Sequence, residues 1–200
     1  MAARVPGYEG RFDAIGWHLM GRIFRLKRTL GKGPLSLVDL GMGRGRDLIY
    51  FSRRGFRVLG IDIDRAGLLK AQSRAARLKT PIRTELGDIR TIRLSRTFNV
   101  VYSSTTLNHL PKSSRGRRIG HFKASTMAGG INAVNAFVSS PNHEAGPDLD
   151  SGVTMFRPGE LARYYGNWEI IEAGELGFDC RFGGSNHKHF VDEVIARKPR

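Results

Sequence analysis

The chain of 200 residues contains one cysteine, Cys180, and therefore cannot form an internal disulfide bond. The lack of disulfide bonds is typical of a reducing compartment. Long apolar runs are also lacking: none approaches the roughly 20 residues that a membrane-spanning helix needs. Residues 1–10 do not contain the apolar core of a signal peptide. These absences predict a cytoplasmic protein that has no membrane partner.

Acidic residues are scarce, and the shortage is uneven along the chain. Against 33 Lys and Arg there are 18 Asp and Glu, which gives a net charge of +15. Residues 1–120 carry 25 basic and 8 acidic groups, a net charge of +17, whereas residues 121–200 carry −2. Such an excess favours an anionic small molecule or a nucleic acid as partner, but a solvated arginine-rich surface explains it equally well. Aromatic residues interleaved with the basic clusters, which favour nucleic acid, are missing.

A chain of this length with 40% hydrophobic residues can bury one core. We expect a single domain over residues 35–200, preceded by an N-terminal segment, residues 1–34. In that segment, apolar residues recur at helical spacing between positions 12 and 30. The pattern predicts an amphipathic helix that could close over a site as a lid.

Strand and helix patterns alternate along the rest of the chain. This alternation, followed by a terminal pair of strands, predicts an α/β fold with a doubly wound, mostly parallel sheet. Strands are expected at 35–40, 57–62, 82–86, 98–102, 131–138, 168–176 and 190–197, and helices at 46–54, 65–79, 115–127 and 158–165.

The most informative stretch covers residues 37–47, which read Leu-Val-Asp-Leu-Gly-Met-Gly-Arg-Gly-Arg-Asp. An apolar strand runs into a turn with three glycines, and glycine lets a backbone adopt positive φ and approach a ligand closely. A second acid, Asp62, ends the next strand 23 residues after Asp39. In a parallel sheet a carboxylate at that point can accept both hydroxyls of a ribose. The two elements together predict an adenosine site.

The pattern disfavours a dinucleotide. The dinucleotide fingerprint requires glycine at position 46, where this chain has Arg46. Asp39 would also repel a pyrophosphate at close range. A ligand with a cationic amino-acid end suits that acid better, and S-adenosylmethionine combines such an end with an adenosine.

With these elements in place, the chain resembles class I S-adenosylmethionine-dependent methyltransferases through residues 39–45, 62, 87–89 and 128–130. The resemblance implies a Rossmann-like fold of seven strands with the last strand antiparallel, and S-adenosyl-L-methionine as cofactor. It implies that the glycine turn holds the methionine moiety, an acid holds the ribose, another acid holds the adenine amino group, and two isoleucines sandwich the ring. The residues implied for the cofactor are Asp39, Gly41, Met42, Gly43, Arg46, Asp62, Ile63, Asp88, Ile89 and Ser104.

A narrower resemblance covers residues 156–169, Phe-Arg-Pro-Gly-Glu-Leu-Ala-Arg-Tyr-Tyr-Gly-Asn-Trp-Glu. This stretch looks like the tellurite-resistance methyltransferases, which implies a small acceptor such as a metalloid oxyanion or a thiol. Residues 177–188 depart from that family's acceptor-binding stretch, so the sequence leaves the acceptor open.

Three histidines are candidates for chemistry. In this fold the polar run 103–110 faces the transferable methyl, and His109 within it is the candidate general base. A thiolate, selenite or tellurite would need no base. His187 and His189 share one face of a strand at a spacing compatible with metal ligation, but no third ligand is evident, and we expect no metal site.

Two alternatives stay open, an RNA or ribosome methyltransferase that uses the basic N-terminal part, and a non-catalytic cofactor-binding or RNA-binding module. Enzymes that methylate base amino groups place an Asn/Asp-Pro-Pro-aromatic turn after the fourth strand, where this chain has Tyr-Ser-Ser-Thr. Cys180 lies too far along the chain to be the nucleophile of a cytosine-C5 enzyme. The sequence therefore favours a small acceptor and does not predict an oligomeric state.

Overall fold

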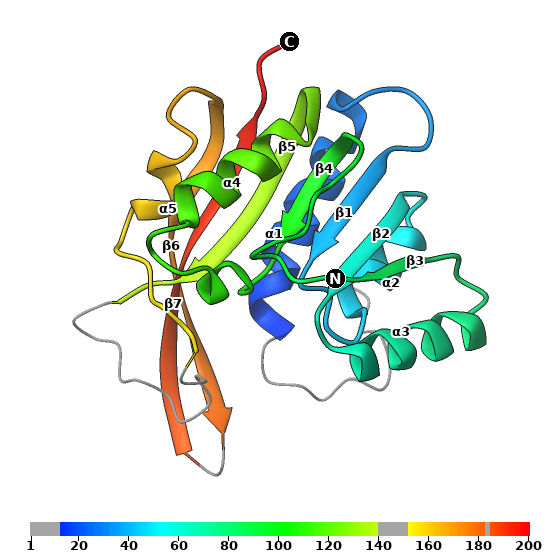
Figure 1. Ribbon diagram of the computed structural model, residues 1–200, viewed down its shortest axis with the longest axis horizontal. Helices are drawn as coiled ribbons and strands as arrows, with labels where there is room; N and C mark the ends of the chain where they lie inside the picture. Colours follow the sequence, from blue (N-terminus) through cyan, green and yellow to red (C-terminus); the bar gives the residue numbers. More distant parts are fainter. Residues whose placement is uncertain (1–12, 140–151, 183–184) are drawn as a thin grey trace.

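A computed structural model of the chain describes residues 13–139, 152–182 and 185–200. At its centre is a seven-stranded sheet with the order β3-β2-β1-β4-β5-β7-β6 (Figure 1). All neighbouring strands pair in parallel except β7, which is antiparallel to both β5 and β6. The expected α/β fold, with its last strand antiparallel, is thereby confirmed. The strands are β1 (Ser36–Leu40), β2 (Arg57–Asp62), β3 (Arg83–Leu86), β4 (Phe98–Ser103), β5 (Thr126–Phe137), β6 (Glu169–Phe182) and β7 (Ser185–Arg197).

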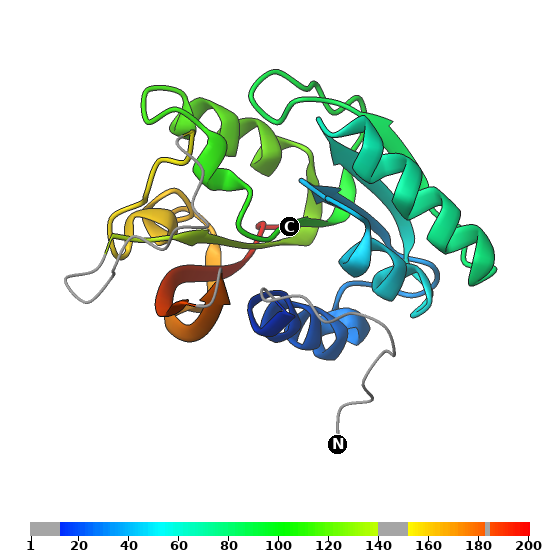
Figure 2. The ribbon, with the colours of Figure 1, turned by 90° about the horizontal axis from the view of Figure 1, so that it is seen from below.

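Helices cover both faces of the sheet (Figure 2). Three of them, α1 to α3, pack against one face, and α4 and α5 pack against the other. None of the helices in the described part of the chain is long and apolar enough to cross a membrane. The helices are α1 (Asp13–Leu26), α2 (Arg46–Ser52), α3 (Arg65–Arg77), α4 (Arg115–Ala124) and α5 (Glu160–Arg163), with short 3-10 helices η1 (Lys27–Thr29) and η2 (Leu107–His109).

The N-terminal helix α1 is a layer of the core. Its residues Leu19, Met20 and Ile23 are fully buried, and they share a hydrophobic cluster with β1, α2 and the end of β7. The helix expected over 12–30 ends at Leu26 and continues as η1. The structure shows α1 packed against the sheet, so its movement as a lid stays a prediction. Residues 1–12 of the expected segment lie outside the described residues.

The last two strands are longer than the sequence predicts. The β6–β7 hairpin stays paired out to Phe182 and Ser185 and projects beyond the sheet (Figure 1). β5 pairs with β7 only up to Phe137 and Val191, so among the described residues no third strand pairs with the outer half of the hairpin. In β6 apolar residues continue to alternate through Phe178, Cys180 and Phe182, so this extension could have been predicted, whereas residues 185–189 of β7 are all polar and hide the pattern that marks a strand.

Local signals predicted some of the other boundaries and missed others. Asp64 accepts a hydrogen bond from the Ala66 amide at 2.9 Å and caps α3, as its sequence position predicts. β5 begins at Thr126, five residues before the expected strand, because the two glycines at 129 and 130 lie within the strand and do not precede it.

Candidate functional site

The glycine turn joins the end of β1 to the start of α2. Gly41, Gly43 and Gly45 all have positive φ, of 83°, 53° and 72°. A Cβ on Gly41 would lie 2.1 Å from Thr106 Oγ1, so this position must be glycine for the loop after β4 to approach. A Cβ on Gly43 would meet nothing within 4 Å. The turn is therefore tightly packed on one side and open at Gly43.

Asp62, the last residue of β2, lies directly beside this turn. Its Oδ2 accepts a hydrogen bond from the Gly43 amide at 2.7 Å, and its Oδ1 accepts one from the Asp64 amide at 2.9 Å. The parallel register pairs Leu40 with Ile61, which brings the two strand ends level. Next to the carboxylate, Ile63 is 64% exposed, an uncovered apolar side chain at the edge of the turn.

A buried acidic layer supports the turn from below. Asp39 is buried in β1, and its pKa is raised well above the usual range by burial and by the nearby carboxylates of Asp47 and Asp62. Asp47, in the first turn of α2, accepts a hydrogen bond from the Tyr102 hydroxyl at 2.7 Å and another from Arg46 Nε. The sequence analysis missed Asp47 and Tyr102. Asp47 could have been noticed as an acid in a helix's first turn, but no signal marks Tyr102.

The third strand brings a second acid to the same edge. The Gly87 amide donates to the Asp62 carbonyl at 2.9 Å, which places Asp88 next to the end of β2. Arg90 donates three hydrogen bonds to the Asp88 carboxylate, two from Nε and one from its amide, and these bonds lower the Asp88 pKa. Ile89 is mostly buried in the core on the α4 side.

The loop after β4 completes the edge. Ser103 Oγ donates to the Leu40 carbonyl at 3.0 Å, and Ser104 is partly buried. Thr105 has a φ of 57°, which is rare for a β-branched residue, and its amide donates to Asn135 Oδ1 at 2.7 Å. His109 lies farther along, exposed on η2. Backbone strain such as that of Thr105 is concentrated at functional sites.

The structure therefore brings most of the predicted cofactor residues to one edge, the carboxyl ends of β1 to β4. Three of the side chains considered in the sequence point elsewhere. Met42 is buried in the core on the α1 side against Gly60, so only its backbone is at the turn. His187 and His189 do share a strand face on β7, with their Nε2 atoms 2.9 Å apart, and the His189 ring packs against Phe137 of β5 and Phe178 of β6.

Comparison with known proteins gives this arrangement a class. Residues 37–130 match the family described as "Methyltransferase domain", a range that contains the glycine turn, Asp62 and Asp88. A curated relative, "Probable S-adenosyl-L-methionine-dependent methyltransferase TehB" of Haemophilus influenzae, is 27% identical over 142 residues, which cover 71% of this chain and 49% of that protein. "Hemagglutinin 1" of Eikenella corrodens is 24% identical over 71% of this chain and 46% of its own length. The chain thus spans about half the length of these relatives.

Solved structures share the fold. TehB from Haemophilus influenzae superposes with a TM-score of 0.76 at 24% identity, covering 88% of this chain and 60% of its own. Magnesium protoporphyrin IX methyltransferase from Synechocystis PCC 6803, with bound SAM, gives 0.68 at 14% identity, covering 99% and 86%. The [4+2]-cyclase SpnF gives 0.69 at 17% identity, covering 96% and 83%.

The matched segment and the shared fold make the chain similar to class I methyltransferase domains, and a relative that it resembles is described as dependent on S-adenosyl-L-methionine as cofactor. Within that class the chain resembles TehB of Haemophilus influenzae in both sequence and structure.

The residues present fit that cofactor. The open side of Gly43 leaves room for the backbone to approach a ligand, and the buried acids below the turn favour a cationic group. Exposed Ile63 offers an apolar surface for a flat ring. Asp62 at the end of β2 and Asp88 just after β3 add two carboxylates, which can accept hydrogen bonds, to the same edge.

Proposed function

We propose that this chain transfers a methyl group from S-adenosyl-L-methionine to a small-molecule acceptor. The observation that carries the proposal is the hydrogen bond between the Gly43 amide and Asp62 at the shared edge of β1 and β2. It joins the two elements that an adenosine site needs, a glycine turn open to a ligand and an acid for the ribose. The resemblance to TehB supports a small acceptor such as a metalloid oxyanion or a thiol.

Each part of the edge has a role in this proposal. The turn over Gly41 and Gly43 holds the amino-acid end, with Asp39 and Arg46 close to it. Asp62 accepts the ribose hydroxyls, while Ile63 and Ile89 lie on either side of the adenine. Two further members of the predicted set, Asp88 and Ser104, face the adenine amino group and the methyl-bearing sulfur, respectively.

When bound, the cofactor supplies a methyl group on a positively charged sulfur, which an acceptor lone pair displaces in line. The protein's contribution is then to position the two reactants and exclude water, because fixed orientation removes much of the barrier to a reaction between two molecules. The Thr105 loop, tied to Asn135, is the element that fixes the acceptor side. His109 remains a candidate base. It is exposed on η2, which suits an acceptor that enters from solvent.

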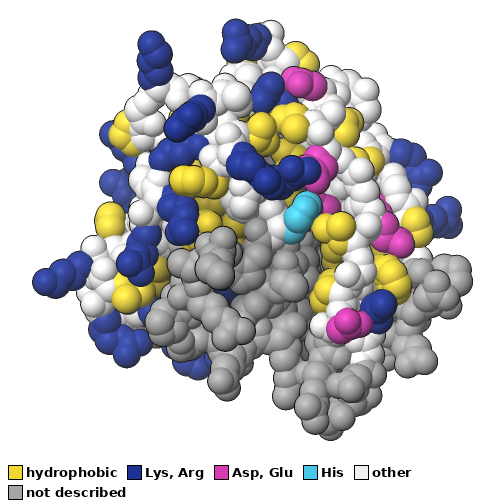
Figure 3. Space-filling view, turned by 180° about the vertical axis from the view of Figure 1, so that it is seen from behind, with side chains coloured by type: hydrophobic (Ala, Val, Ile, Leu, Met, Phe, Trp, Pro, Cys, Tyr) yellow, Lys and Arg dark blue, Asp and Glu magenta, His cyan; other side chains and the backbone are white. Residues whose placement is uncertain are grey.

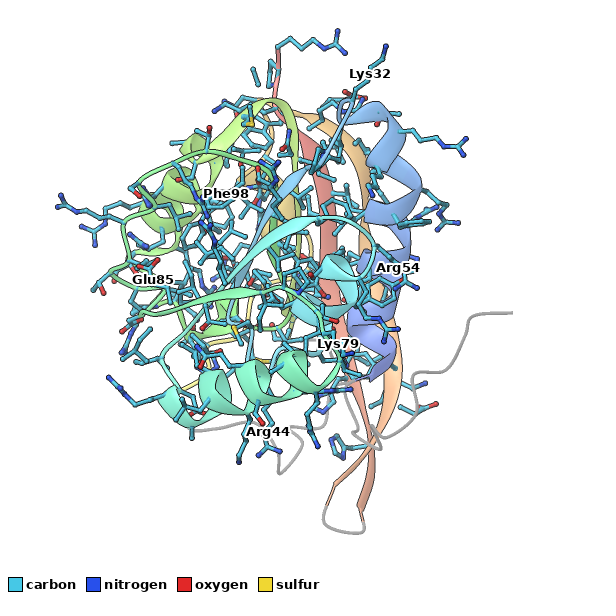
Figure 4. The ribbon with its side chains drawn as sticks, turned by 90° about the vertical axis from the view of Figure 1, so that its right-hand side faces the viewer. Lys32, Arg44, Arg54, Lys79, Glu85 and Phe98 are labelled. Carbon is cyan, nitrogen blue, oxygen red and sulfur yellow. The ribbon has the colours of Figure 1, made fainter. Side chains whose placement is uncertain are left out.

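One observation favours RNA as a binding partner and not as the methyl acceptor. A groove of about 560 Å³ runs along the edge strand β3 and is lined by Arg83, Arg93 and Arg96. Its other lining residues include Glu85 and Phe98, which Figure 4 labels. Arg83 and Phe98 begin their strands, so the groove extends toward the amino ends and away from the glycine turn. An anionic polymer bound there would contact the protein without presenting a base to the methyl group.

Labelled methyl transfer tests the proposal. The chain is incubated with S-adenosyl-L-methionine labelled in its methyl group, and label is measured in a pool of small acceptors and in bulk RNA. We expect label in small molecules, lost in Asp62→Ala and kept in Glu85→Gln, a matched variant of an exposed acid. Label in RNA alone would replace the small-acceptor proposal.

A further inference from the structure

Two buried polar side chains on the α1 face of the sheet each have one atom without a hydrogen-bond partner among the described residues. Asn135 of β5 and Glu193 of β7 are paired across the strands and are 0% and 2% exposed. Asn135 Nδ2 and Glu193 Oε2 have no hydrogen-bond partner among the described residues. Native structures rarely leave such groups unpaired, because burial without a partner costs free energy. A donor and an acceptor that share one face can together bind a group that both donates and accepts.

This pair is connected to the proposed site of transfer. The other end of the Asn135 side chain, Oδ1, accepts the hydrogen bond from the Thr105 amide, and Thr105 follows the predicted cofactor residue Ser104. Thr105 keeps its strained backbone next to that bond. The Asn135 side chain therefore joins the unpaired Nδ2 atom to the loop that we expect to face the methyl group.

Glu193 is also connected to solvent. Its Oε1 is bonded to Nδ1 of His18 on α1, and the His18 side chain is 40% exposed. Burial raises the pKa of Glu193, Glu172 of β6 raises it further, and His18 and Arg22 of α1 lower it. Figure 3 shows a histidine side chain beside acidic side chains on this face of the molecule. A proton that reaches Glu193 thus has a route outward through His18.

We propose that Asn135 and Glu193 bind the methyl acceptor, and that Glu193 accepts the proton that the acceptor loses. The inference rests on the proposed function and narrows its substrate to a small molecule with an O–H, S–H or N–H group. A bond forms between the acceptor atom and the methyl carbon as the sulfur–carbon bond breaks, and the electron pair of that bond stays on sulfur. The acceptor's proton moves to Glu193 Oε2.

The acidic side chains near this pair exclude an oxyanion as the methyl acceptor. An oxyanion would be placed against Glu193 and Glu172, and like charges repel strongly where water is excluded. The same cluster, His18 with these two acids, has ligand atoms within 4.8 Å of one another and could hold a cation. Arg22 is already paired with Glu172, however, and its positive charge opposes a second cation there.

Glu193→Gln is the decisive variant. Its matched control is Glu175→Gln, which changes an exposed acid of β6. Both are compared with the wild-type chain in three measurements. The first is transfer of labelled methyl to 2-mercaptoethanol, ethanolamine, catechol, selenite and tellurite. The second is calorimetric binding of S-adenosylhomocysteine, and the third is the midpoint of thermal unfolding with and without Mg²⁺, Mn²⁺ or Zn²⁺.

We expect the wild-type chain to methylate at least one proton-bearing compound and neither oxyanion. Glu193→Gln lowers that transfer about 100-fold, the usual contribution of a general base. It leaves the affinity for S-adenosylhomocysteine within twofold and the unfolding midpoint unchanged or higher, because a buried charge is removed. With the thiol, the loss shrinks as the pH rises past about 8.5, since a thiolate needs no base.

Four results would overturn the inference. If Glu193→Gln had both a lower unfolding midpoint and a weaker affinity for S-adenosylhomocysteine, the role of Glu193 would be to hold α1 in place. Transfer to selenite or tellurite, or to no compound while S-adenosylhomocysteine binds, would reject the acceptor class and leave the proposed cofactor site standing. A metal-dependent rise in midpoint that Glu193→Gln abolishes would identify a cation site. Failure of the wild-type chain to bind S-adenosylhomocysteine would instead reject the proposed function itself.

Discussion

The hydroxyl of Tyr102 donates a 2.7 Å hydrogen bond to Oδ2 of Asp47, and both side chains are buried. The bond joins the middle of the sheet to the first turn of α2, directly under the glycine turn. Desolvation and the Asp47 carboxylate raise the Tyr102 pKa well above its usual range, so the hydroxyl keeps its proton and remains a donor. We infer that this pair holds the turn in the shape that the cofactor needs.

Tyr102→Phe should cost about 1–3 kcal/mol of unfolding free energy, because it leaves an Asp47 oxygen buried with one donor fewer. Urea unfolding measures the cost. A double-mutant cycle with Asp47→Asn is the control: the two losses should fall well short of adding up, as they do for residues that share one bond. Additive losses would mean that the pair does not act as a unit.

Asp39 gives the cofactor site a pH dependence. Its folded-state pKa lies above its unfolded value, so ionisation of Asp39 costs stability, and that cost is relieved progressively as the pH falls through the raised pKa toward the ordinary one. A cationic ligand binds the ionised form, so affinity for S-adenosyl-L-methionine should fall as the pH is lowered. Asp39→Asn should weaken binding about tenfold at neutral pH, flatten its pH dependence and stabilise the free protein. Calorimetry across pH tests this, and an unchanged slope in Asp39→Asn would assign the dependence to another group.

Much of the cofactor edge could be predicted because its signals are local. Glycines after an apolar run, and an acid one strand-helix-strand unit later, determine both the turn and Asp62 once the strands are parallel. The cap at Asp64 follows from the same kind of short-range chemistry. For these residues the pattern in the sequence and the contacts in space coincide.

The acceptor side could not be predicted in the same way. His18 and Glu193 are 175 residues apart, and they meet because β7 inserts antiparallel between β5 and β6 under α1. The pairing of Asn135 with Glu193 depends on that register, which no local pattern reveals. Tyr102 likewise looks like an ordinary apolar strand residue until Asp47 is placed beside it.

Relief of backbone strain should separate stability from function. Thr105 and Lys79 are the non-glycine residues with positive φ in the described part of the chain, at 57° and 50°. Glycine at either position should stabilise the fold by roughly 1 kcal/mol. Thr105→Gly should also slow methyl transfer at least tenfold because the acceptor loop loses its fixed position, whereas Lys79→Gly, at the end of α3, should leave transfer unchanged. Equal rates in the two variants would remove the functional role of the strain.

The arginine groove along β3 should bind RNA without making RNA a substrate. Replacement of Arg83, Arg93 and Arg96 by Gln should lower RNA affinity and reduce the slope of log affinity against log salt by about two to three, one for each lost phosphate contact. Binding of S-adenosylhomocysteine should not change, because the groove lies away from the turn. Filter binding over a salt series measures the slope, and a slope unaffected by the triple variant would place any RNA contact elsewhere.

The central claim is that Asp62 and the turn at Gly43 hold the cofactor, and calorimetric titration of S-adenosylhomocysteine tests it most directly. We predict one-to-one binding to the wild-type chain and to Glu85→Gln, and affinity at least roughly 30-fold lower in Asp62→Ala, the scale of two lost hydrogen bonds. Circular dichroism of each variant checks that the fold is kept. Absence of binding to the wild-type chain, or equal affinity in folded Asp62→Ala, would contradict the account.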